Sequence, residues 1–169
     1  MDRAEIEAVL REYHAPLVRL CRVYHSERAD AEDLYQEIAV SLWRSAAAFR
    51  GDSSIRTWFY RVAHNTAITH KRKWWRRARA VSDLNPAVHA DRSARPDDRL
   101  IEAARAESLR KAILELPIDD RQLVALHLEG VSLNEMEAVT GVRAGTLATR
   151  LSRLRARLAA TLSPKEARP

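Results

Sequence analysis

The sequence predicts an all-α protein in which two small helical domains are joined by a flexible linker. Composition is the first reason, because only 4 of the 169 residues are glycine and helix-forming alanine, leucine, arginine and glutamate dominate. The second is apolar periodicity, which is helical over residues 3–75 and again over 101–162. The third is the stretch 77–100, where prolines and charged residues replace that periodicity. These observations divide the chain into a domain at 1–76, a linker at 77–104, a domain at 105–162 and a tail at 163–169.

The first domain is expected to contain three helices. One is predicted from Glu5 to Tyr24, where apolar residues follow helical spacing. A second begins near Asp30, a residue type that caps helix N-termini, and runs to about Ala47. The turn-forming cluster Phe49-Arg50-Gly51-Asp52-Ser53-Ser54 follows it, and a third helix extends from about Ile55 to Lys73.

The second domain ends in a pattern typical of a helix-turn-helix. Gly130 suits the position just after a helix, and Ser132-Leu133-Asn134-Glu135 is a capping box that opens a short helix. Thr140-Gly141 predicts a tight turn, and a long basic helix follows from about Arg143 to Leu162. A short helix, a glycine turn and a longer basic helix are the parts of a DNA-binding helix-turn-helix.

The final helix has two different faces at about 100° per residue. One arc of the helix contains the leucines Leu147, Leu151, Leu154 and Leu158. The opposite arc contains the small residues Gly145, Thr149, Ser152 and Ala156. Arginines flank the small residues, with Arg143, Arg150, Arg153 and Arg157 on one side and Arg155 on the other. No acidic residue lies between Arg143 and Arg157. A small polar crest beside guanidinium groups suits base edges and phosphates. A basic helix alone is usually a solvated face, but the capping box, the turn and the leucine arc together favour DNA binding.

Two further faces are predicted in the first domain. On the helix after Ser54, the stripe of Arg61, Asn65, Ile68 and Arg72 suits bases and phosphates. A basic cluster with two tryptophans follows: Lys71, Arg72, Lys73, Trp74, Trp75, Arg76, Arg77 and Arg79. Aromatic rings beside cations suit unstacked bases, although packing of the tryptophans on the domain surface explains them equally well. The preceding helix presents a stripe that suits a basic protein partner, with a merely solvated face as the alternative: Asp33, Gln36, Glu37, Val40 and Arg44.

Composition excludes several functional classes. The net charge of +6 and the pI of about 10.0 allow nucleic acid, an acidic protein or an anionic membrane as partners. Cys21 is the single cysteine, which favours a reducing compartment, and no apolar run reaches the roughly 20 residues of a membrane span. Cys21 and His25 lie one turn apart, but no second pair completes a metal site. Without a catalytic dyad or a phosphate-binding loop, we expect no enzyme, no cofactor, no small-molecule ligand and no membrane insertion.

Several blocks of the sequence together resemble a known family. Asp30 to Glu37, Leu42-Trp43, Phe49 to Ser53 and Thr57 to Asn65 closely resemble region 2 of bacterial sigma-70 family sigma factors. Gly130 to Ser132, Gly145-Thr146-Leu147 and Arg150-Leu151 are similar to their region 4, so the short chain resembles the extracytoplasmic-function (ECF) group. The resemblance covers most of residues 5–162. It implies a cytoplasmic initiation factor that directs core RNA polymerase to promoters, together with an anti-sigma protein that can hold it near the membrane.

The resemblance also implies roles for individual residues. Asp33, Gln36, Glu37 and Val40 would bind the clamp coiled coil of the polymerase, while the flap would hold the second domain. The minus-10 element would meet one set of residues: Phe49, Arg50, Gly51, Asp52, Ser53, Ser54, Arg61, Asn65 and Arg72. The minus-35 element would meet another: Arg143, Thr146, Thr149, Arg150, Ser152, Arg153 and Arg157.

The chain departs from the family pattern at positions that bear on promoter sequence and not on fold. Ala148 stands where the family often has a basic residue, Thr149 replaces a serine, and Met136-Glu137 replaces isoleucine-alanine. Trp74-Trp75 is also unusual in a stretch that is normally just basic. Two rival functions remain: a helix-turn-helix regulator that acts without polymerase, and a helical bundle that binds acidic proteins.

Overall fold

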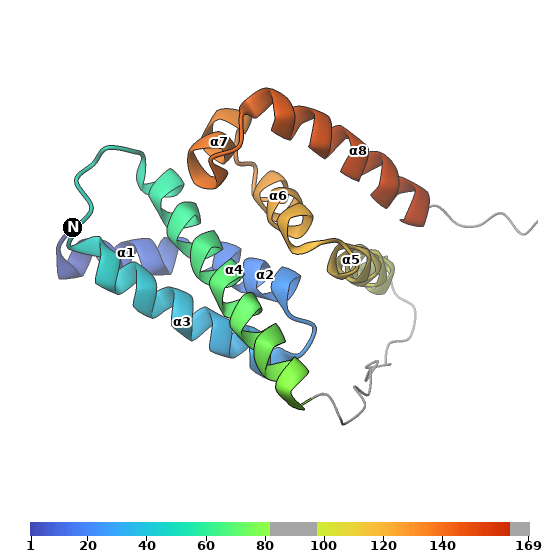
Figure 1. The fold of residues 1–169 in the computed structure, drawn as a ribbon, viewed down its shortest axis with the longest axis horizontal. Helices are drawn as coiled ribbons and strands as arrows, with labels where there is room; N and C mark the ends of the chain where they lie inside the picture. The colour runs from blue at the N-terminus through green and yellow to red at the C-terminus, as the bar shows by residue number, and fades with distance from the viewer. Residues whose placement is uncertain (82–97, 163–169) are drawn as a thin grey trace, which may run out of the picture.

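The computed structural model has eight helices and no strand among the residues it describes (Figure 1). The description covers the backbone of residues 1–81 and 98–162 and the side chains of residues 1–73 and 103–162. The helices are α1 (Arg3–Glu12), α2 (His14–Tyr24), α3 (Arg28–Ala46), α4 (Ile55–Val81), α5 (Asp98–Leu114), α6 (Ile118–Leu128), α7 (Leu133–Thr140) and α8 (Ala144–Leu162). The all-α prediction is therefore confirmed.

The predicted single helix from Glu5 to Tyr24 is wrong, because the structure divides it into α1 and α2. Tyr13 lies between them with φ −94° and ψ 10°. The physical cause is Pro16, in the first turn of α2. A proline ring clashes with the carbonyl group four residues earlier, here that of Glu12, so a continuous helix cannot pass through this point. The chain bends there, and both helices still bury apolar side chains.

Helices extend into both ends of the predicted linker. α4 continues past Lys73 to Val81, and α5 begins at Asp98, so residues 77–81 and 98–104 have helical backbone. Residues 82–97 and the predicted tail at 163–169 lie outside the described residues. So do the side chains of Trp74, Trp75 and the arginines that follow them. The predicted domain bounds stay a prediction.

The first domain is built around the contact of α3 with α2 and α4. Leu34, Ile38 and Leu42 lie on one side of α3 and are fully buried, as their spacing predicts. α4 contributes Phe59 and α2 contributes Leu17 to the same core. The opposite side of α3 is thereby left to solvent.

The second domain confirms the local signals of its sequence. Gly130 has φ +68°, and the Val131 and Gly130 N–H groups donate to the carbonyls of Leu126 and His127, which closes the C-terminus of α6. Ser132 and Glu135 form a reciprocal capping box at the start of α7. Gly141, with φ +74°, reverses the chain into α8. The four leucines predicted to face the core are all buried: Leu147, Leu151, Leu154 and Leu158.

The two domains pack against each other instead of standing apart. α4 contacts α7, and α2 contacts α5 and α6; in Figure 1 the first turns of α4 lie next to α7. Arg19 of α2 makes two hydrogen bonds of 2.7 Å, one to each carboxylate oxygen of Glu129. Arg56 Nη2 donates to the Glu129 backbone carbonyl at 2.7 Å. From the other domain, Arg121 donates to the carbonyls of Leu114, Leu116 and Tyr24, the last residue of α2.

Candidate nucleic-acid and protein interfaces

The outer face of α8 is a shallow basic surface. Of the seven residues predicted for the minus-35 element, Arg150 is half-buried and the other six are exposed: Arg143, Thr146, Thr149, Ser152, Arg153 and Arg157. Thr146, Arg150 and Arg153 line a hollow of about 510 Å³ near the start of the helix. Gly145 and Thr149 line the hollow, and the Thr149 hydroxyl donates to the Gly145 carbonyl at 3.1 Å. Small side chains between guanidinium groups let the helix backbone approach a groove closely.

Two arginines of α8 have partners on α6 that the sequence did not reveal. Arg150 Nε donates to Asp120 Oδ1 at 2.7 Å, and Arg155 Nη2 lies 2.6 Å from His127 Nε2. The Asp120 side chain is 16% exposed and that of Arg150 is 40% exposed. Arg150 is therefore held against its own domain, whereas Arg153 makes no ion pair among the described residues.

The loop from Phe49 to Ser54 joins α3 to α4 and carries most of the predicted minus-10 residues. The Phe49 ring packs on the buried Trp58 ring at a centroid distance of 5.3 Å, while Arg50 and Asp52 are exposed. Gly51 has a φ of +82°, a backbone conformation that residues with a Cβ atom rarely adopt. The loop is thus anchored at Phe49 and turns sharply two residues later.

Ser54, at the end of that loop, makes hydrogen bonds with the first turn of α4. Ser54 Oγ accepts a hydrogen bond from the Thr57 N–H at 3.1 Å and donates to Thr57 Oγ1 at 2.9 Å. Ser54 is therefore the N-cap of α4, a role that the prediction of base capture overlooked. The Ser53 hydroxyl oxygen is buried and finds no hydrogen-bond partner among the described residues.

The predicted stripe on α4 is only partly available. Arg61, Asn65 and Arg72 are exposed along the helix, and Ile68 between them is half-buried. Lys71 does not belong to an exposed basic cluster, because it is 7% exposed, and burial together with the charge of Arg121 lowers its pKa to about 8. A wheel projection places Lys71 beside the basic stripe, but in the folded protein its side chain is buried, within reach of the charges of Arg121 and Asp30.

The acidic stripe of α3 is exposed as predicted. Asp33 and Gln36 face solvent, and the apolar residue Val40 is 47% exposed. Trp43, which was not among the residues predicted for this face, is 43% exposed one turn further on. The surface therefore combines carboxylates with an apolar patch, as protein-binding surfaces do.

Glu37, in the same stripe, is tied to α4. Its two carboxylate oxygens lie 3.6 Å from His70 Nε2 and 3.4 Å from Lys73 Nζ. His70 Nδ1 lies 3.2 Å from Nε2 of the buried His25, and His25 Nδ1 lies 3.7 Å from Asp30. This polar chain links α3 to the second half of α4.

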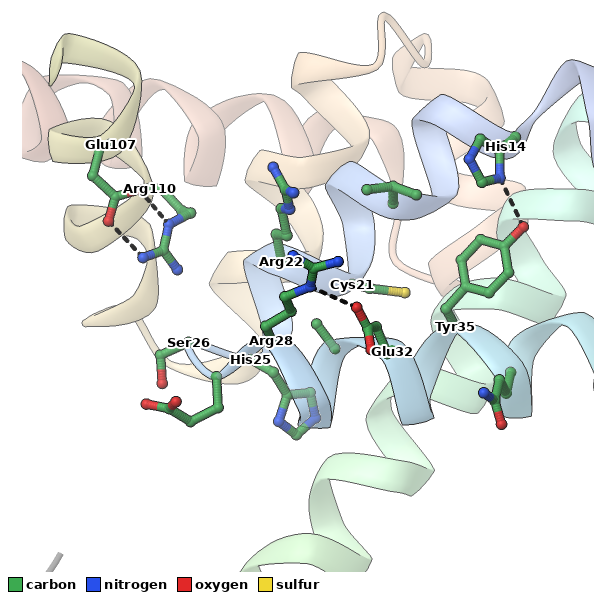
Figure 2. Close-up of a pocket in the computed structure, with 14 residues that line it drawn as sticks. His14, Cys21, Arg22, His25, Ser26, Arg28, Glu32, Tyr35, Glu107 and Arg110 are labelled. Atoms are coloured by element: carbon green, nitrogen blue, oxygen red, sulfur yellow. Dashed lines mark hydrogen bonds and ion pairs between the residues drawn. The ribbon is translucent and has the colours of Figure 1, made fainter. Parts of the chain in front are cut away.

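Cys21 and His25, one helical turn apart, are both buried. Burial raises the pKa of Cys21 to about 12 and, with nearby cations, lowers that of His25 to about 3. No group of three potential ligands that could hold a metal ion occurs among the described residues. Both side chains line a groove of about 860 Å³ between α2, α3 and α5 (Figure 2).

The groove in Figure 2 runs across both domains. Its rim carries ion pairs within single helices, Arg28 with Glu32 at 2.7 Å and Arg110 with Glu107 at 2.6 Å. The His14 ring and the Tyr35 hydroxyl meet at 2.9 Å at one end. The arginines that α3 and α5 contribute to the groove are therefore already paired with neighbouring glutamates.

The exposed faces of the chain together define its class of protein. The helix-turn-helix has an exposed basic face, and α4 carries a second polar face. The face of α3 combines acidic and apolar residues. These are the features of a two-domain helical DNA-binding protein that also has a surface for a protein partner. In the part of the chain that is described, no helix is both long enough and apolar enough to cross a membrane.

Comparison with known proteins identifies the family. The family models Sigma-70 region 2 and Sigma-70 region 4 match residues 9–77 and 106–158. The chain is 30% identical to the ECF RNA polymerase sigma factor SigM of Mycobacterium tuberculosis over 163 residues, which cover 95% of this chain and 79% of that protein. It is 29% identical to the RNA polymerase sigma factor YlaC of Bacillus subtilis, with coverage of 92% and 91%. The chain therefore belongs to the sigma-70 family, in the ECF group, and functions in promoter recognition and transcription initiation.

Solved structures share the fold. The sigma factor RpoE of Bartonella quintana, solved with the anti-sigma factor NepR, superimposes with a TM-score of 0.74 at 23% identity and covers 96% of this chain and 99% of its own. CnrH, solved with the cytosolic domain of CnrY, gives a TM-score of 0.67 at 21% identity, with coverage of 98% and 92%. At these identities the likeness concerns the fold alone.

Proposed function

We propose that this chain is a non-catalytic, cytoplasmic initiation factor that docks on core RNA polymerase through α3 and holds promoter DNA through α4, its preceding loop and α8. The observation that carries the proposal is the presence of three separate exposed faces on one chain. Two of them suit DNA and the third, on α3, suits a protein. The chemistry of RNA synthesis then belongs entirely to the polymerase.

The α3 face is proposed to bind the clamp coiled coil of the polymerase. Asp33 and Gln36 are exposed, and Val40 supplies an apolar centre beside them. Glu37 already lies close to His70 and to the cation Lys73, so its contact with a basic partner would replace or share those contacts. A mixed face of this kind gains affinity from its apolar centre and orientation from its charges. The flap is the proposed partner of the second domain.

The loop and α4 are proposed to open and hold the minus-10 element. Extrusion of a base costs a few kcal/mol, which a pocket and cationic backbone contacts can offset. The Phe49–Ser54 loop, anchored on Trp58, offers the pocket, and Arg61, Asn65 and Arg72 line the neighbouring face of α4. An asparagine between arginines suits a base edge between two phosphates.

Contact with both promoter elements requires the domains to separate. Elements near minus-10 and minus-35 lie about 25 base pairs apart, or about 85 Å of duplex at 3.4 Å per base pair. α4, the longest helix described, spans about 40 Å for its 27 residues, and α7 packs directly against it. The bridges from Arg19 and Arg56 to Glu129 must therefore break when the chain binds a promoter.

An anti-sigma protein is proposed as the regulator, able to hold the chain near the membrane. The similar RpoE structure contains an anti-sigma factor. In this chain the groove between α2, α3 and α5 touches both domains, so a partner bound there would keep them together. That state would oppose the separation that promoter binding needs.

The first test is transcription in vitro by core polymerase and the purified chain on genomic DNA, with sequencing of the transcript 5′ ends. We expect initiation at specific promoters, and we expect Asp33→Lys to abolish it because the reversed charge faces the clamp. Glu12→Lys, which makes the same change on an exposed residue of α1, should remain active. Tight sequence-specific duplex binding by the chain alone would instead support the regulator without polymerase.

The second test concerns opening of the minus-10 element. Asn65→Ala should lower the permanganate reactivity of thymines in that element about tenfold, since one good base contact contributes about 1–3 kcal/mol. Binding of the variant to core polymerase should be unchanged, as measured by native gel shift. Thr66→Ala, one position along the same helix, is the control. Normal opening by the Asn65 variant would show that this face of α4 does not read DNA.

A further inference from the structure

The N-terminus of α8 is capped from outside the helix. Arg143 precedes the first helical residue, and its carbonyl accepts the Leu147 N–H at 3.0 Å, so it occupies the N-cap position. Its side chain has only donors and cannot accept the free N–H groups of the first turn. An acceptor must therefore come from another residue.

Glu137 of α7 supplies that acceptor. Its Oε2 accepts the Ala144 N–H at 2.7 Å, and its backbone carbonyl accepts the Gly141 N–H at 2.8 Å. The left-handed conformation of Gly141 turns the chain so that these two contacts form together. Glu137 therefore fixes both the turn and the first residue of the DNA-facing helix, at a position where the family usually has alanine.

The same carboxylate changes the electrostatics of the DNA face. The N-terminus of a helix attracts anions, including phosphates, and a carboxylate placed there occupies that position. A second acid, Asp120, pairs with Arg150 at 2.7 Å. Between Arg143 and Arg157 the helix itself carries no acidic residue. The negative charge on this face is thus supplied by α6 and α7.

We propose that Glu137 is a positioning residue that orders α8 and at the same time lowers the intrinsic affinity of α8 for DNA. The inference rests on the proposed reading of the minus-35 element by this helix. A DNA face weakened in this way holds the promoter only when polymerase adds the minus-10 contacts. Contacts between cationic side chains and phosphates form on DNA of any sequence. The weakened affinity therefore keeps the chain without polymerase from being held on non-promoter DNA.

The test measures duplex binding by the full-length chain, with fluorescence anisotropy on a labelled minus-35 duplex taken from a mapped promoter. Glu137→Gln keeps an acceptor for the Ala144 N–H but loses the charge, so the Kd should fall about two- to fivefold at low salt. Glu137→Ala should also bind more tightly, while its Tm falls by about 2–4 °C because the cap is lost. Glu115→Gln, an exposed acid of the same domain, should change neither quantity.

The outcomes separate this inference from the proposed function. If Glu137 only orders the helix, Glu137→Ala binds more weakly and Glu137→Gln binds like the original chain, which overturns the inference alone. If the holoenzyme shows no preference for the minus-35 element, the proposed role of α8 fails and the inference fails with it. Tighter binding by both variants, with a lower Tm for the alanine variant alone, supports the inference.

Discussion

Acidification from pH 7 to pH 5 is expected to remove about 4 kcal/mol from the free energy of unfolding, about 2 kcal/mol for each of two histidines. Burial is the main cause that lowers the pKa of His25 and of His64 to about 3. In the unfolded chain both rings take up a proton near pH 6.5, whereas the folded protein keeps them neutral. Their stabilising contribution is therefore complete above pH 6.5 and is lost as the pH falls toward 3.

Urea unfolding followed by circular dichroism at pH 7, 6 and 5 measures this effect. The double variant Tyr24→Phe/His64→Phe replaces the buried hydrogen-bonded pair, whose Oη and Nδ1 atoms lie 3.0 Å apart, with apolar rings of similar shape. It should lose about half of the pH dependence. Tyr24→Phe alone keeps the histidine and should keep the full dependence. A flat stability profile for the original chain would contradict the assignment of both histidines.

Arg153→Ala is expected to weaken binding of the holoenzyme to a promoter with an intact minus-35 element about 5- to 150-fold, the range for loss of a base or phosphate contact of about 1–3 kcal/mol. Its guanidinium is exposed on α8 and makes no ion pair among the described residues, so the Tm should not change. Arg150→Ala differs, because it leaves the 16% exposed Asp120 without its partner and should lower the Tm as well.

Promoter affinity is measured on two templates that differ only in the minus-35 element. Arg105→Ala, which removes an exposed arginine from α5, controls for the general loss of positive charge. The Arg153 variant should lose its preference for the intact element, and the Arg105 variant should keep it. Equal losses on both templates would mean that Arg153 contributes charge without contributing recognition.

The parts of the fold that the sequence predicted correctly depend on neighbours in the chain. The leucine arc of α8, the Ser132–Glu135 capping box and the turn at Gly130 each arise within a few residues, and the structure contains all three. The incorrect prediction of one continuous helix through Tyr13 also has a local cause. Pro16 breaks the helix, but the apolar periodicity continues across it and favours a single helix. The basic faces of α4 and α8 were recognisable because exposed helical stripes follow directly from residue spacing.

The partners of individual side chains could not be predicted, because they come from distant segments. The sequence pattern places Lys71 in a basic cluster, whereas in the fold its side chain is buried and is influenced by the charge of Arg121, 50 residues away in the chain. Arg150 looked free until α6 brought Asp120 to it, 30 residues away in the chain. Nothing in a helical wheel indicates which charges will be neutralised in this way.

Sequence alone therefore determined the helical class, the helix-turn-helix, the polar faces and the family resemblance of this sigma factor, because local spacing and capping specify each of them. Tertiary structure decided how the domains pack through Arg19, Arg56 and Glu129, and which cations of the DNA faces remain free. It also decided that Glu137 caps α8. The reason is that pairing between charges depends on distances between elements, which the sequence pattern of one helix does not contain.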